Sequence, residues 1–336
     1  CVLHVSPCGL PLLPKPVVEV EDVNKEYPFF QGKLITGHPK STRCMNKNLD
    51  GTRMWTTDSC GTIKIWDTAK LELVREIKSD QGTIFALESS ENMMWSASSK
   101  GVATWSETGV RKSQFAGECF SLCKVNHEMW VGEPGSINVY NVEKQMPMKE
   151  LKQGGKDLFV CMALVAGHVW SSTSNQDIVI WDATTKDRLK DIPKAHNKKI
   201  NSIIWVDETV WTASDDFSIK VWDRETFNLI ETLSNAHGGY VYGMTMLAGF
   251  VWSCSWDKCI KIWDAKSRKC VNELRGHHTD TISSIVPVWS NAAGQLQAWS
   301  SSWDKTIGVF EVTPPTAPTA SAPTAATAAA AAAAAA

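Results

Sequence analysis

The sequence predicts an all-β protein with seven repeated units, a seven-bladed β-propeller, and two recurrent aromatic positions carry the prediction. The chain has 336 residues, of which 16 are tryptophan. One set of tryptophans recurs about 40 residues apart, a period typical of repeat architectures. These are Trp55, Trp95, Trp130, Trp170, Trp211, Trp252 and Trp299. A second aromatic follows each one, namely Trp66, Trp105, Tyr140, Trp181, Trp222, Trp263 and Phe310.

Each unit also contains four short segments of β character. In the fifth unit they read "KINSIIWV", "TVWTASD", "SIKVWD" and "LIETLS", at 199–206, 209–215, 218–223 and 229–234. Apolar or alternating runs of this length, separated by polar turns, favour strands. One four-stranded sheet cannot bury both of its faces, whereas seven sheets arranged radially pack each face on a neighbour.

Closure of the ring needs a strand from the start of the chain. The seventh unit supplies three strands before Val312, and "GKLITGH" at 32–38 has the character of the missing one. We expect it to complete the seventh blade and so remove an unpaired edge. The predicted organisation is therefore a linker over 1–31, the propeller over 32–312, and a disordered Pro/Thr/Ala tail over 313–336.

Composition argues against several classes of function. The formal net charge of −2 gives no reason to expect a nucleic-acid partner. The ten cysteines show no zinc-ligand spacing, so we expect reduced thiols in the cytoplasm, no metal and no cofactor. No apolar run approaches the ~20 residues that span a bilayer. Because the chain begins with Cys1, we expect it to be part of a longer polypeptide.

A histidine near the start of a unit, followed by "WTASDDFSIKVWD" at 211–223, resembles the WD40 repeat. The resemblance extends over residues ~33–312 and is most specific in units five and six. It implies a seven-bladed propeller with a buried polar network in the regular units. Those networks would be His196, Thr212, Asp216 and Trp222 in unit five, and His237, Ser253, Asp257 and Trp263 in unit six.

These residue types can satisfy one another, because the carboxylate accepts from the imidazole, the imidazole from the hydroxyl, and the hydroxyl from the indole. Unit one has Cys60 at the aspartate position, and units two and three are expected to lack the network. A Thr/His/Asp set also resembles a catalytic triad. Since the same set recurs in adjacent units, we interpret it as structural and expect no catalytic residues.

The resemblance also implies that partners dock around the central channel. The contributing positions would lie in the loop that enters each inner strand and just before the turn aspartate. Large aromatic and arginine side chains dominate binding hot spots. The alternative is that these rings only pack on one another. The candidate partner-binding residues are Trp256, Trp303, Tyr240, Tyr242, Asp215, Lys199, Asn201, Arg43 and Phe85.

Second strands that begin with tryptophan, as in "VWTAS" and "MWVGE", resemble the C-terminal propellers of DENN-domain Rab exchange factors and of inositol polyphosphate 5-phosphatases. That resemblance implies a role in cytoplasmic signalling or membrane trafficking. The first functional prediction is a non-catalytic scaffold that binds a protein or peptide. The second is an autoregulatory domain that contacts an upstream enzyme or GTPase-exchange domain of the same polypeptide.

Overall fold

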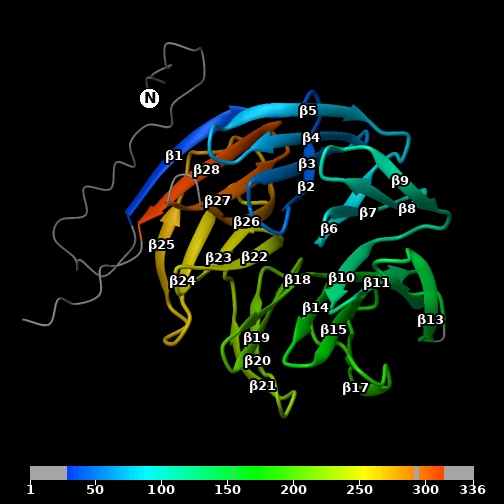
Figure 1. Ribbon diagram of the computed structural model, residues 1–336. Helices are drawn as coiled ribbons and strands as arrows, with labels where there is room; N and C mark the ends of the chain where they lie inside the picture. The colour runs from blue at the N-terminus through cyan, green and yellow to red at the C-terminus, as the bar shows by residue number, and fades with distance from the viewer. Residues whose placement is uncertain (1–28, 154, 291–294, 314–336) are drawn as a thin grey trace, which may run out of the picture.

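The computed structural model describes residues 29–153, 155–290 and 295–313, and these residues form 28 strands and no helix. The strands make seven antiparallel four-stranded sheets arranged around a central axis (Figure 1). The predicted all-β, seven-bladed propeller is therefore confirmed. The predicted linker up to residue 28 and the predicted tail from residue 314 lie outside the described residues.

Four strands follow one another along the chain in each of the first three blades. Blade 1 consists of β2 (Thr42–Lys47), β3 (Arg53–Asp58), β4 (Thr62–Asp67) and β5 (Glu72–Lys78). Blade 2 consists of β6 (Ile84–Ser90), β7 (Met93–Ser98), β8 (Gly101–Ser106) and β9 (Arg111–Phe115). Blade 3 consists of β10 (Ser121–Val125), β11 (Glu128–Glu133), β12 (Ser136–Asn141) and β13 (Met146–Lys152).

Blades 4 to 6 repeat this order. Blade 4 consists of β14 (Phe159–Val165), β15 (His168–Thr173), β16 (Ile178–Asp182) and β17 (Arg188–Ile192). Blade 5 consists of β18 (Ile200–Val206), β19 (Thr209–Ser214), β20 (Ile219–Asp223) and β21 (Leu229–Leu233). Blade 6 consists of β22 (Val241–Leu247), β23 (Phe250–Ser255), β24 (Ile260–Asp264) and β25 (Cys270–Leu274).

Blade 7 joins the two ends of the propeller. It contains β26 (Ile282–Ser290), β27 (Gln295–Ser302), β28 (Thr306–Thr313) and, as its outer strand, β1 (Phe29–Thr36). Figure 1 shows β1 in blue beside β28 in orange, and their pairing runs from Phe29↔Thr313 to Thr36↔Thr306. The predicted closing strand is therefore present, although it begins within the stretch assigned to the linker.

The core is divided among the seven interfaces between neighbouring blades. Each cluster of buried side chains draws on two adjacent sheets. The seven tryptophans of the first register lie on the second strands and are at most 1% exposed. The repeated tryptophan therefore marks the position where each blade fills the wedge against its neighbour.

Ile35 of β1 tests closure of the ring, because it is buried between blades 7 and 1. We expect Ile35→Ala to lower the free energy of unfolding by about 2–5 kcal/mol through loss of packing. The exposed neighbour Thr36 supplies the control, and Thr36→Ala should change stability by less than about 0.5 kcal/mol. Equal denaturant midpoints for the two variants would contradict a stabilising role for β1.

Candidate functional site

Hydrogen bonds connect four side chains across blade 5. The Trp222 indole N–H donates to Thr212 Oγ1 at 2.9 Å, and the Thr212 hydroxyl lies 2.8 Å from His196 Nε2. His196 Nδ1 in turn lies 2.9 Å from the Asp216 carboxylate and donates to it. Thr212 and His196 are fully buried, so a substrate has no access to the hydroxyl. The constellation is thus a packing network rather than a nucleophile with its base.

Blade 6 has the same arrangement. The Trp263 indole donates to Ser253 Oγ at 2.8 Å, Ser253 lies 2.7 Å from His237 Nε2, and His237 Nδ1 lies 3.0 Å from Asp257. The backbone N–H of Gly238 also donates to Asp257, at 2.8 Å. Burial acts to raise the pKa of Asp257, but these hydrogen bonds outweigh it and hold the pKa below its ordinary range. Asp257 therefore stays ionised and fixes the turn that carries Trp256.

Blades 1 and 2 depart from the sequence-based expectation. In blade 1 the carboxylate facing His38 is Asp58, two residues before Cys60, with 3.6 Å between His38 Nδ1 and Asp58 Oδ2. Blade 2 has no network of histidine and aspartate, but it carries a shorter one that was not predicted. Its Gln81 occupies the histidine position and accepts from Ser96 Oγ at 2.6 Å. The Trp105 indole donates to the same hydroxyl, so a buried amide replaces the imidazole.

Backbone bulges direct several candidate residues out of the inner strands. In β18 the ladder passes from Ile200↔Ser214 to Ser202↔Ala213, which leaves Asn201 as the extra residue. The corresponding shift in β22 leaves Tyr242, and that in β6 leaves Phe85. The shift in β2 falls at Arg43 and Cys44. Because a bulged residue is freed from the regular alternation of a strand, its side chain is re-aimed.

Five rings form a connected surface across blades 5 to 7, which we call the aromatic band. Tyr240 is its centre, with ring centroids 5.7 Å from Phe217, 6.3 Å from Tyr242 and 6.4 Å from Trp256. Tyr242 lies 6.0 Å from Trp303. These separations are typical of attractive aromatic pairs. The five residues are Phe217, Tyr240, Tyr242, Trp256 and Trp303.

Exposure differs among the rings. Trp256 is 52% exposed and Tyr240 is 37% exposed, whereas Tyr242 and Trp303 are half-buried. Burial and the nearby Asp215 carboxylate raise the pKa of Tyr242 to about 12, which keeps its phenol neutral. Trp256 is therefore the principal exposed ring, and Trp303 supports the band more than it projects from it.

The remaining candidates divide into three groups. Arg43 joins the band, because its guanidinium lies 5.0 Å from the Trp303 ring centroid. Asn201 and Asp215 bond each other at 2.7 Å, and Lys199 is exposed beside them. Phe85 lies apart from the band, stacked at 5.1 Å on Phe120 of the neighbouring blade.

Sequence reasoning did not select Phe217 and Lys198. Phe217 occupies a left-handed turn position, with φ of 70°, where blades 6 and 7 have Lys258 and Lys305. Lys198 Nζ lies 5.3 Å from the Phe217 ring centroid and 5.4 Å from that of Tyr240. An aromatic residue at a position held elsewhere by lysine was the signal that could have identified Phe217.

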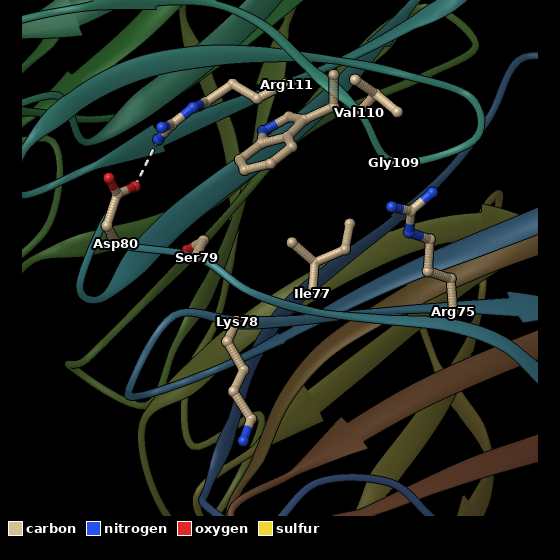
Figure 2. A pocket seen from close by; sticks show the side chains of 9 residues that line it. Arg75, Ile77, Lys78, Ser79, Asp80, Gly109, Val110 and Arg111 are labelled. Carbon is tan, nitrogen blue, oxygen red and sulfur yellow. Dashed lines mark hydrogen bonds and ion pairs between the residues drawn. The ribbon is translucent and has the colours of Figure 1, made fainter.

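A hollow of about 420 Å³ lies at blades 1 and 2, beside β5 and the start of β9 (Figure 2). The Arg111 guanidinium in its lining pairs with Asp80, and Arg75 donates to the Thr108 carbonyl at 2.6 Å. Figure 2 shows the Lys78 ammonium directed away from the other side chains. Because its guanidinium groups are already engaged by the protein, the hollow offers an anion little.

No group of three or more metal-ligating side chains occurs among the described residues. In the same part of the chain, no helix is long and apolar enough to cross a membrane.

A family model described as "WD domain, G-beta repeat" matches residues 188–223, 227–264 and 268–311. The chain is a seven-bladed β-propeller that contains WD40 repeats. Each matched segment of the WD40 chain begins with the outer strand of one blade and ends with the third strand of the next, as in β17 followed by β18, β19 and β20. This offset of one strand explains why blade 7 must recruit β1.

Two comparisons place this WD40 chain among known proteins. The Rho GTPase-activating protein gacL of Dictyostelium discoideum is 25% identical to it over 84% of the chain. The match spans 45% of the length of that relative. The crystal structure of the computationally designed Ika8 protein superposes with a TM-score of 0.63 at 18% identity. That superposition covers 82% of this chain and 97% of the designed one, and it supports the fold alone. The resemblance to DENN-domain and phosphatase propellers stays a prediction.

The buried histidines of the WD40 networks predict a pH-dependent stability. Burial lowers the pKa of His38 to about 4, against the attraction of Asp58, while an unfolded histidine titrates near 6.5. The unfolded chain therefore binds more protons between about pH 6.5 and pH 4, and stability falls as the pH is lowered through that window. The variant His38→Gln copies Gln81 of blade 2. We expect its melting temperature to decline less than that of the unaltered chain as the pH is lowered from 6.5 to 4.

The exposed His127 provides the control, and His127→Gln should keep the decline of the unaltered chain. Identical slopes for His38→Gln and the unaltered chain between pH 4 and pH 6.5 would exclude a contribution from His38.

Proposed function

We propose that this propeller is a non-catalytic interaction module that binds a partner protein or peptide on the aromatic band. WD40 propellers are typically protein-interaction scaffolds. The observation that carries the proposal is the exposure of Trp256, because its ring is 52% exposed on a turn that Asp257 holds in place. A rigid, exposed tryptophan buries a large area at low entropic cost and is a frequent hot-spot residue.

Packing within the protein does not account for Trp256. One side of its ring lies against Gly239, where an added Cβ would lie 2.8 Å from the indole, and its centroid is 6.4 Å from that of Tyr240. A smaller side chain at residue 256 would leave the network of His237, Ser253 and Asp257 intact. Retaining an indole that is 52% exposed therefore favours recognition over stability, since exposed apolar surface is typical of interaction sites.

The proposal for the protein that contains this propeller rests on the gacL relative. The gacL relative is a GTPase-activating protein, and the match covers less than half of its length. We place the propeller within a larger cytosolic signalling or trafficking protein. The second candidate function is autoregulation, in which the aromatic band contacts an enzyme or GTPase-regulating domain of the same polypeptide. The match leaves more than half of gacL uncovered, and this additional length is the observation that favours autoregulation.

Trp256→Ala tests the binding face. We expect partner proteins captured by the 336-residue chain to be depleted at least tenfold in the variant, because a hot-spot truncation costs about 2 kcal/mol or more. The melting temperature should change little, since the ring is half exposed. The measurement is quantitative mass spectrometry of captured proteins alongside thermal unfolding.

Trp289 gives a matched control. It is 50% exposed but lies near the end of β26, on the face opposite the loops that carry Tyr240 and Trp256. Trp289→Ala should leave the captured set unchanged. Loss of the same partners in both variants, or in neither, would refute the proposed face.

A binding test with the rest of the proposed longer polypeptide distinguishes the two candidate functions. Autoregulation predicts that the isolated remainder of that polypeptide binds the propeller and that Trp256→Ala weakens this binding. A scaffold role predicts capture of other proteins, with no binding of the remainder. Titration of the remainder into the propeller by isothermal calorimetry distinguishes the two results.

A further inference from the structure

We infer that the partner of the aromatic band is a short acidic segment, with an apolar anchor residue flanked on both sides by carboxylates. The inference rests on the proposed function, because it names the chemistry that the same surface selects. The observation behind the inference is that two cations lie on opposite sides of the aromatic band.

Arg43 and Lys198 occupy those two sides. The Arg43 guanidinium lies 5.0 Å from the ring centroid of Trp303, the last ring of the band on the side of blade 1. Lys198 Nζ lies on the side of blade 5, 5.3 Å from the centroid of Phe217, the first ring, and 5.4 Å from that of Tyr240. Attraction to the ring faces places each charge at the edge of the apolar surface. A bound segment would therefore meet a cation at either end of its apolar contact.

Both cations lack an acidic partner within the described part of the chain. Arg43 and Lys198 form no ion pair with any residue of 29–153, 155–290 or 295–313. The exposed Lys258 and Lys305, on the turns that follow Trp256 and Trp303, are likewise absent from these pairs. Exposed positive charge without a partner therefore recurs along the band.

The carboxylates nearby are engaged by local donors. Asp257 accepts from His237 and Gly238, and Asp304 accepts from His278 at 3.1 Å and from the Thr279 backbone at 2.8 Å. The carboxylate of Asp215 accepts from Asn201. Asp215, Asp257 and Asp304 thus lie half-buried in the turns. Asp280, before β26, is exposed, and its carboxylate accepts from the Thr281 backbone at 2.7 Å. The exposed cations Arg43, Lys198, Lys258 and Lys305 outnumber this single exposed acid, so the charges available to a partner are mainly positive.

An acidic peptide fits this arrangement better than a nucleic acid. A phosphate backbone would carry negative charge along the whole face and would pass over the ionised aspartates of the turns. Two separate carboxylates can reach the two separate cations and avoid those aspartates. The apolar residue between them would lie against Trp256 and Tyr240, where most of the exposed ring surface is.

A random twelve-residue peptide library displayed on phage tests this inference against the purified 336-residue chain. We expect the selected sequences to share an aromatic or aliphatic residue with aspartate or glutamate on both sides. A synthetic peptide of that consensus should bind at least about tenfold more weakly to Arg43→Glu and to Lys198→Glu. Raising the salt from 50 mM to 500 mM should also weaken binding.

Lys190 on β17 supplies the control, because it is exposed on the outer strand of blade 4, and Lys190→Glu should bind the peptide normally. Melting temperatures confirm that each variant is folded. Peptides that require Trp256 but show no enrichment in acidic residues would overturn the inference and leave the proposed function standing. So would unchanged affinity in both charge-reversal variants.

Failure of the proposed function gives a different result. Peptides that bind the Trp256→Ala variant as tightly as the unaltered chain, or a library that yields no binder, would contradict the proposed face and the inference together. Displacement of the bound peptide by a twelve-nucleotide oligothymidylate at equal concentration would also overturn the choice of an acidic peptide.

Discussion

The pairing of β1 with β28 is the constraint on which the rest of the molecule depends. Every blade buries its two faces only against its neighbours, so an incomplete seventh blade would expose an edge and loosen two interfaces at once. Ile35 shows how the constraint acts, because the strand that closes the ladder also contributes a buried side chain to the cluster between blades 7 and 1. The first and last described strands thus form one sheet.

A closed ring holds the loops of the binding face at fixed positions. On that base, the polar networks fix individual turns, and the bulges of the inner strands direct single side chains outward. Tyr242 illustrates the combination, since it is the extra residue of a bulge in β22 and its ring is bracketed by Tyr240 and Trp303. Preorganised rings of this kind lose little entropy when a partner binds. The aromatic band is therefore a consequence of the same repeat that builds the core.

The sequence predicted the fold because its strongest signals arise from the core. A buried tryptophan recurs in every blade for one packing reason, so its spacing reveals the architecture. Two network residues were not predicted. Gln81 takes the place of a histidine with a different residue type, and Asp58 supplies the carboxylate from a shifted position. A pattern of residue identities cannot reveal such replacements, although the need to pair buried polar atoms can.

The site was predicted less completely, and the reason is again physical. Trp256 and Trp303 occupy equivalent turns, yet Arg43 and Tyr242 cover Trp303 while Trp256 stays open. The exposure of each ring in the aromatic band depends on contacts between residues of different blades, and these residues lie far apart in the sequence. Phe217 is part of the aromatic band and Lys198 lies beside it for the same reason, since both contact Tyr240 of the next blade.

Fluorine NMR of the chain labelled with 5-fluorotryptophan tests the central claim, that partners bind on the aromatic band, most directly. Resonances of Trp256, Trp205 and Trp289 are assigned by single substitutions to phenylalanine; all three indoles are exposed, by 52%, 47% and 50%. Trp205 and Trp289 lie at the other ends of the inner strands from the loops that carry the band. On titration with a bound peptide, the account predicts a shift of the Trp256 resonance alone among the three. A shift of Trp205 or Trp289 with Trp256 unchanged would contradict it.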